Sequence, residues 1–137
     1  MTFLFGDEHV QRYRETDGEE GHVWREGSTI VLLSTKGRTT GLDRTVPLIY
    51  DWDGGNPVIV ASKGGAPDHP GWYKNILANP EVELQVGTKT LKAKARTASG
   101  AERQKLWDNA ITWWPPYVDY QKKTQREIPV VVLDPVN

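Results

Sequence analysis

Apolar and polar positions alternate along part of the chain with the two-residue period of half-buried strands. Val82, Leu84 and Val86 alternate with acidic and amide side chains, and residues 91–96 alternate aliphatic residues with lysine and arginine. The short segment Gly87-Thr88-Lys89 lies between these two runs. Because successive side chains of a strand point to opposite faces, the pattern predicts an antiparallel hairpin with one face in the core.

Four further segments are predicted to be strands because they are rich in β-branched and aliphatic residues. They are 28–34, 45–52, 57–62 and 128–133. Pro47 cannot donate a ladder hydrogen bond, which favours an edge or a bulge at its position. Asp53-Gly54-Gly55-Asn56 predicts a hairpin turn, since glycine supplies the positive φ that such turns need.

Helical spacing of apolar residues predicts three helices between and after the strands. The first covers 72–77, and the second ends at Pro115-Pro116. Ser99 and Glu102 predict a capping box at the start of this second helix. A short polar helix is expected over 117–126.

Residues 1–21 are predicted to form an N-terminal arm. Asp7 is expected to cap a helix that ends near Asp17-Gly18. Two interpretations of the arm stay open. It is either a poorly ordered terminus or a lid that can also touch a membrane surface.

This order of elements predicts an α+β fold of six strands, mostly in hairpin order, with two to four peripheral helices. The chain lacks the alternation of strand and helix that builds a parallel dinucleotide-binding sheet. A small antiparallel β-barrel accounts for the strands economically, because closure removes the exposed edges of the sheet. We expect this barrel domain to span residues 22–137.

Composition narrows the class of protein. A chain of 137 residues is expected to form one domain. Its net charge of −1 argues against non-specific nucleic-acid binding, and no apolar run approaches the ~20 residues that span a bilayer. The lack of a secretory signal, together with the absence of cysteine, agrees with a cytoplasmic location. The three histidines show no metal-ligand spacing, so no metal is expected.

Two loops that follow predicted strands combine glycine with cations. The loop 35–44 contains Lys36, Arg38 and Arg44, and the loop 61–65 contains Lys63 before two glycines. Glycine lets backbone N–H groups approach an anion closely, and the arginine fork suits phosphate. A pair of solvated basic loops is the plainer alternative. Neither loop carries a nucleotide-binding fingerprint.

An aromatic segment follows the second helix. Tyr117 and Tyr120 lie one helical turn apart, with Trp114 about one turn earlier. Such a face can stack on a flat ring, and a phenol can donate a proton or a hydrogen bond. Packing of these rings in the core is the competing interpretation.

Taken together, these motifs resemble the deazaflavin-dependent nitroreductase family, whose members are small split β-barrel oxidoreductases that use coenzyme F420. The likeness runs from about His22 to the C-terminus. It is carried by segments that occur in the same order, at 35–41, 44–48, 61–65, 70–80, 117–121 and 128–133.

The resemblance implies a split β-barrel that binds reduced coenzyme F420 (F420H2), from which hydride passes to a quinone, an activated alkene or a nitroaromatic acceptor. Trp114 stands where the nitroimidazole-activating members have tyrosine, so activation of such compounds is in doubt. The arm resembles a segment that family members are suspected to lay on membranes. This likeness implies peripheral contact with the inner face of the plasma membrane.

The same resemblance assigns roles to individual residues. Tyr117 and Ser62 are the catalytic candidates, and Tyr117 also lines the substrate pocket with Trp114 and Tyr120. The expected cofactor contacts come from the two cation loops, the second strand and the first helix. They are Arg38, Thr39, Thr40, Arg44, Val46, Pro47, Leu48, Ala61, Ser62, Lys63, Gly64, Trp72 and Asn75.

Two other functions remain open at this point. The same barrel can bind FMN, as in pyridoxamine-oxidase-like flavoproteins, or it can carry a flavin without catalysis. The sequence also leaves open whether the protein is a monomer or a homodimer.

Overall fold

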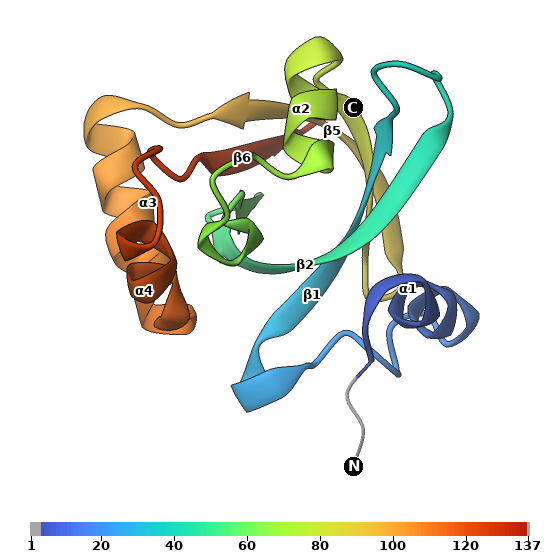
Figure 1. Cartoon of the computed structure of the whole chain (residues 1–137). Coiled ribbons are helices and arrows are strands. Elements are labelled where there is room, and N and C mark those ends of the chain that lie inside the picture. Colours follow the sequence, from blue (N-terminus) through green and yellow to red (C-terminus); the bar gives the residue numbers. More distant parts are fainter. Residues whose placement is uncertain (1–3, 137) are drawn as a thin grey trace.

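A computed structural model describes residues 4–136 and shows a closed antiparallel barrel with helices around it (Figure 1). The strands follow one another around the barrel in the order β1-β2-β3-β6-β5-β4. Their bounds are β1 Thr29–Lys36, β2 Asp43–Asp53, β3 Asn56–Val60, β4 Glu81–Val86, β5 Lys89–Thr97 and β6 Val130–Pro135. The predicted α+β class with six antiparallel strands is therefore confirmed.

Four α-helices surround the barrel within the described residues, at the upper end of the predicted range. Figure 1 shows α3 and α4 together on one side of the barrel and α1 on the other. The α-helices are α1 Gly6–Glu15, α2 Gly71–Ala78, α3 Gly100–Trp113 and α4 Pro116–Lys122, and the single turns η1 Arg25–Gly27 and η2 Lys63–Gly65 are 3-10 helices. No helix between residues 4 and 136 is long and apolar enough to cross a membrane.

The core forms on both faces of the strands. Inward-facing residues such as Val31, Leu33 and Leu84 pack against Trp72 and Ile76 of α2 in one cluster. A second cluster joins β3 and β6 to α3, and a third joins β1 to α1. Burying such apolar side chains stabilises the fold by about 1.5–3 kcal/mol each. The helices therefore cover outward-facing apolar residues that would otherwise meet water.

Although the barrel is closed, one half of β2 has a strand partner on one side only. This strand is 11 residues long, whereas β3 has 5 and pairs only with Tyr50–Asp53. Residues 43–49 of β2 pair with β1 but have no partner on the side of β3. Pro47 lies in this unpaired half, which agrees with the edge that proline predicts.

The N-terminal arm packs on the barrel. Tyr13 of α1 is fully buried, and its hydroxyl donates to the carbonyl of Ile30 at 2.9 Å and accepts from the amide of Gly87 at 2.6 Å. Burial raises the pKa of this phenol to about 12, so it stays protonated. The poorly ordered terminus is therefore the wrong interpretation for residues 4–21. Residues 1–3 and 137 lie outside the described part of the chain.

The predicted side-chain caps of two helices do not form. Helix α1 begins at Gly6 with Phe5 at the N-cap, so Asp7 lies inside the first turn. Ser99 is at the N-cap of α3, but its side chain makes no capping hydrogen bond. Glu102 instead accepts two hydrogen bonds from Arg96 at 2.6 and 3.1 Å. Two charge-assisted bonds to a guanidinium outweigh one bond to a backbone amide.

Candidate functional site

Two neighbouring hollows lie where β2 is unpaired. The larger, about 490 Å3, extends from Val46–Ile49 of β2 to the aromatic residues of α4 and to the arm. The smaller, about 440 Å3, lies beside the first cation loop. Val46 and Trp72 line both hollows. One elongated ligand can therefore occupy the two together.

The smaller hollow gathers the cations of the first loop. Arg38, Thr39, Thr40 and Arg44 line it with exposed side chains. Exposed guanidinium and hydroxyl groups on one wall can donate several hydrogen bonds to an anion. This wall suits a phosphate or carboxylate tail.

Asn75 holds the first cation loop in place. It is 5% exposed, and its Oδ1 accepts from the Arg38 amide at 3.1 Å and from Arg38 Nη1 at 2.9 Å. Its Nδ2 donates to Thr35 Oγ1 at 3.1 Å. The polar atoms of Asn75 are thus occupied by protein groups. Its expected contact with the cofactor ring stays a prediction, and its observed contacts orient Arg38.

The second cation loop, residues 61–66, which we call the Lys63 loop, has an unusual backbone. Lys63, Gly64 and Gly65 have φ values of 47°, 64° and 86°, in the left-handed region. This conformation is strained for lysine, and such strain concentrates at functional sites. Gly65 also needs its lack of a side chain, because a Cβ would lie 2.5 Å from the carbonyl oxygen of Tyr120. Lys63 itself is exposed at the edge of the larger hollow.

Arg126, which precedes β6 in the chain, supports the Lys63 loop. Its guanidinium donates to the carbonyls of Ala66, Ala61 and Ser62 at 2.9, 3.2 and 2.8 Å. Sequence reasoning missed this residue. It lies in a polar segment whose pattern gives no sign of a partner some 60 residues away.

The aromatic wall of the larger hollow comes from α4 and the end of α3. Tyr117 is 4% exposed and its ring lies 5.7 Å from that of Trp113 and 6.1 Å from that of Tyr120. No group among residues 4–136 hydrogen-bonds to the Tyr117 hydroxyl, and Tyr117 lines the larger hollow. Burial, and then the neighbouring Tyr120, raise the Tyr117 pKa far above its usual value. The phenol is therefore neutral at physiological pH and can donate a hydrogen bond.

The arm closes the remaining side of the larger hollow. Phe5, His9 and Trp24 line it, and the Trp24 ring lies 6.0 Å from that of Trp114. The Trp24 indole donates to the carbonyl of Leu4 at 3.0 Å, which ties the arm to the wall. The lid interpretation of the arm agrees with this position, although the sequence did not indicate which arm residues would line the hollow.

The structure brings together nearly all of the predicted site residues. Val46, Pro47, Leu48, Ser62, Lys63, Gly64, Trp72, Trp114, Tyr117 and Tyr120 line the larger hollow. Ala61 is the exception, because its side chain is fully buried in the core, its amide donates to the carbonyl of Pro129 and its carbonyl accepts from Arg126. Ligand contacts at all these positions remain predictions.

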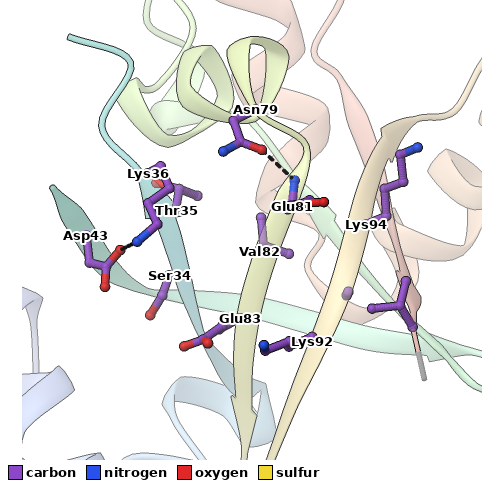
Figure 2. Close-up of a pocket in the computed structure, with 12 residues that line it drawn as sticks. Ser34, Thr35, Lys36, Asp43, Asn79, Glu81, Val82, Glu83, Lys92 and Lys94 are labelled. Atoms are coloured by element: carbon purple, nitrogen blue, oxygen red, sulfur yellow. Dashed lines mark hydrogen bonds and ion pairs between the residues drawn. The ribbon is translucent and has the colours of Figure 1, made fainter. Parts of the chain in front are cut away.

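A third hollow, of about 480 Å3, lies on another face between β1, β4 and β5 (Figure 2). Its charges alternate in sign, because Glu81 is opposite Lys94 and Glu83 is opposite Lys92 across the two strands. Lys36 forms an ion pair with Asp43 at 2.5 Å nearby. Opposite charges at such positions stabilise the strand pair and cancel one another. This hollow therefore has the character of a solvated strand face. Residues 4–136 contain no cluster of three or more candidate metal ligands.

Comparison with known proteins bears on the identity of this site. A model of the F420H2-dependent quinone reductase family matches residues 6–135. An F420H2-dependent quinone reductase of Mycobacterium tuberculosis strain H37Rv is 42% identical over 132 residues, which cover 91% of this chain and 86% of the relative. A putative second reductase of that name from the same strain is 33% identical over 84% of this chain and 97% of its own.

Solved structures agree with this assignment. An F420-H2-dependent reductase (FDR-A) is 46% identical, with a TM-score of 0.71, over 77% of this chain and 93% of its own. A chain described as a domain-swapped dimer is 43% identical, with a TM-score of 0.75, over 93% of this chain and 95% of its own. A putative pyridoxamine 5'-phosphate oxidase from Listeria innocua, 12% identical with a TM-score of 0.56 over 79% of this chain and 84% of its own, shares only the fold. The resemblance found in the sequence is confirmed, and the chain belongs to the F420H2-dependent quinone reductase family.

Proposed function

We propose that this protein is a reductase that binds reduced coenzyme F420 across the two hollows and uses it to reduce a quinone. Membership of the family supports this function. The structural observation that carries it is the junction at Val46 and Trp72, where a cation-lined hollow meets an aromatic one. A ligand with an anionic tail and a flat ring needs both environments side by side.

The residues present fit such a cofactor. Arg38 and Arg44 would hold the anionic tail in the smaller hollow, and Lys63 would add a cation at the edge of the larger one. The half-buried apolar residues of β2 and Trp72 would hold the ring. When bound, the reduced deazaflavin supplies the hydride.

The aromatic wall would bind and orient the acceptor. The Tyr117 hydroxyl would donate a hydrogen bond to the quinone oxygen that gains negative charge, and its raised pKa keeps it in the neutral, donating form. Ser62, a half-buried residue of the Lys63 loop, is a second hydrogen-bond donor that lines the same hollow. Burial of the surrounding rings would exclude water from this oxygen, which strengthens each hydrogen bond.

Trp114 favours quinones over nitroimidazoles as acceptors. It has an indole at the position where the nitroimidazole-activating members of the deazaflavin-dependent nitroreductase family have a phenol. Its ring lies 6.0 Å from that of Trp24, so the two narrow the entrance to the hollow. A flat ring with few polar substituents fits best beside them.

We also propose that the protein meets its acceptor at a membrane surface. Phe5, which lines the larger hollow, and Val23, which directly precedes Trp24 in the chain, are 56% and 66% exposed. Exposed apolar side chains of this size can insert into the interfacial region of a bilayer. Sedimentation with phospholipid vesicles tests this, and a Phe5→Ser, Val23→Ser variant that sediments as fully as the wild type would contradict it. The oligomeric state, monomer or homodimer, can be measured in the same samples.

The proposed function is tested first by binding. The purified protein is titrated with coenzyme F420 and, in parallel, with FMN, while tryptophan fluorescence is followed, because Trp72 lines both hollows. We expect micromolar or tighter binding of F420 and quenching of fluorescence, with little response to FMN. Preference for FMN would overturn the cofactor assignment.

Turnover is tested next. Oxidation of F420H2 is followed with a panel of quinones, enones and nitroaromatic compounds. We expect the quinones to be reduced fastest. Binding of F420 without oxidation by any acceptor would support a flavin carrier in place of a reductase.

A further inference from the structure

Arg126 touches both flanks of the strained turn in the Lys63 loop. Its Nη groups donate to the carbonyls of Ala61 and Ser62, before the left-handed residues, and its Nε donates to that of Ala66, after them. A planar guanidinium fixes the relative positions of the three oxygens, because its donors lie in one rigid plane. The turn is therefore held from outside by a single side chain.

The same arginine is fixed to the helix that carries the site tyrosines. Gln121 of α4 donates from Nε2 to the carbonyl of Arg126 at 2.7 Å and accepts from the amide of Ile128 at 2.9 Å. Gln121 directly follows Tyr120, whose carbonyl is in contact with Gly65. Arg126 thus connects the cofactor half of the site to the acceptor half.

We propose that Arg126 is a positioning residue that holds the Lys63 loop in its left-handed form at a fixed distance from the α4 tyrosines, and that His69 makes this hold dependent on pH. The inference rests on the proposed function of the site. It assigns no contact with the cofactor to Arg126, which acts through the carbonyls of the loop.

Strain is the reason why the loop needs such support. Lys63 has φ 47°, a conformation that lysine would not keep in an isolated chain. Contacts with neighbouring groups must therefore stabilise it. Gly65 supplies close packing on α4, and Arg126 supplies three hydrogen bonds. Without the guanidinium, the Lys63 side chain and the adjacent backbone amides lose their fixed orientation.

His69 gives the arrangement its pH dependence. Its Nδ1 accepts a hydrogen bond from Arg126 Nη1 at 3.1 Å, which requires the neutral ring, and the ring packs 4.8 Å from that of Tyr73. Burial, Arg126 and Lys74 lower the pKa of His69 below its usual value, and Asp68 opposes them. Protonation would remove the acceptor and place a second cation beside the guanidinium.

The sign of the effect follows from this lowered pKa. The unfolded chain binds the proton more tightly than the folded one, so stabilisation by neutral His69 is complete above about pH 6.5. It is lost as the pH falls from there toward the pKa of the folded state. In the folded protein the Lys63 loop should loosen as His69 itself takes up the proton, around and below this lowered pKa.

The test is a titration with coenzyme F420 of three proteins at pH 7.5 and pH 5.5. They are the wild type, Arg126→Lys and His69→Asn. Lysine keeps the charge and loses the fork, so we expect its Kd at pH 7.5 to rise about tenfold, the effect of one charge-assisted hydrogen bond. Asparagine places an acceptor near the position of Nδ1 and does not titrate. We therefore expect His69→Asn to bind F420 with wild-type affinity at pH 7.5 and to lose less affinity than the wild type at pH 5.5.

A second readout needs no cofactor. In amide NMR spectra of the protein alone, the Gly64 and Gly65 resonances should move with a midpoint below pH 6.5 in the wild type and stay fixed in His69→Asn. This measurement keeps the proposal testable if Arg126→Lys does not fold.

Each outcome is decisive for one statement. Equal Kd values of folded Arg126→Lys and wild type at pH 7.5 would overturn the positioning role, even if the variant melts earlier. The same pH response in His69→Asn and wild type would overturn the role of His69. Failure of the wild type to bind F420 would instead overturn the proposed function, while the glycine resonances would still report on the loop.

Discussion

The two cation loops of the site carry similar residues and are held in different ways. In the first loop, Asn75 binds the amide and the guanidinium of Arg38, so the cation itself is oriented. In the Lys63 loop, Arg126 binds backbone carbonyls, and the Lys63 ammonium makes no hydrogen bond or ion pair within residues 4–136. The first loop presents an oriented guanidinium. The Lys63 loop presents a fixed backbone with a mobile ammonium group. A fork suits a phosphate, and a mobile charge suits a group whose position varies.

The largest effect is expected from a substitution that distorts the backbone of the Lys63 loop. Gly65→Val should destabilise the protein by about 3 kcal/mol, because it adds left-handed strain to a clash with the carbonyl of Tyr120. It should also abolish F420 binding. Gly64→Ala is the matched control, since nothing lies within 4 Å of its Cβ and only the cost of its φ remains. Chemical denaturation measures both, and equal destabilisation would contradict the account of Gly65.

The next largest effect is expected from a substitution that leaves both loops intact. It distinguishes reduction of the acceptor from binding of the cofactor. Tyr117→Phe should lower kcat for quinone reduction by about a hundredfold, because it removes the proposed hydrogen-bond donor to the developing oxyanion. The Kd for F420 should stay within about twofold of wild type. Steady-state kinetics and the fluorescence titration measure the two quantities. An unchanged kcat would remove Tyr117 from the mechanism.

The third effect tests how Arg38 is oriented. Asn75→Leu leaves the Arg38 amide and Thr35 without their buried partner, which should cost about 2 kcal/mol of stability and weaken F420 binding about tenfold. Asn75→Asp is the control, because a carboxylate can still accept from Arg38 and from the Thr35 hydroxyl. We expect it to bind F420 more tightly than the leucine variant. The reverse order would show that Asn75 does not act through Arg38.

The smallest effect sharpens the contrast between a fixed and a mobile charge. Arg38→Lys should weaken F420 binding by about tenfold through loss of the fork, and Lys63→Arg should change it by less than about threefold. Lys63→Ala should weaken binding and reduce its dependence on salt. Equal affinity in wild type, Arg38→Ala and Lys63→Ala would remove both loops from the cofactor site.

Local patterns in the sequence predicted the elements well. The alternation at 82–86 and 91–96 predicted β4 and β5 to within about two residues at each end, and the apolar runs predicted the other strands. The capping box at Ser99 failed, because Arg96, brought close by the end of β5, competed for Glu102. A pattern reports which backbone conformation a segment prefers. It does not report which neighbour a side chain will meet.

The sequence by itself determined the antiparallel six-stranded barrel, the two cation loops and the aromatic segment, because these depend on periodicity and residue type over short stretches. Only the tertiary structure decided how the site is held together. Closure of the barrel brings Arg126 to the Lys63 loop, Asn75 to Arg38 and Trp24 to Trp114. These partners are far apart along the chain, and their contacts depend on the geometry of barrel closure, which no short stretch of sequence contains.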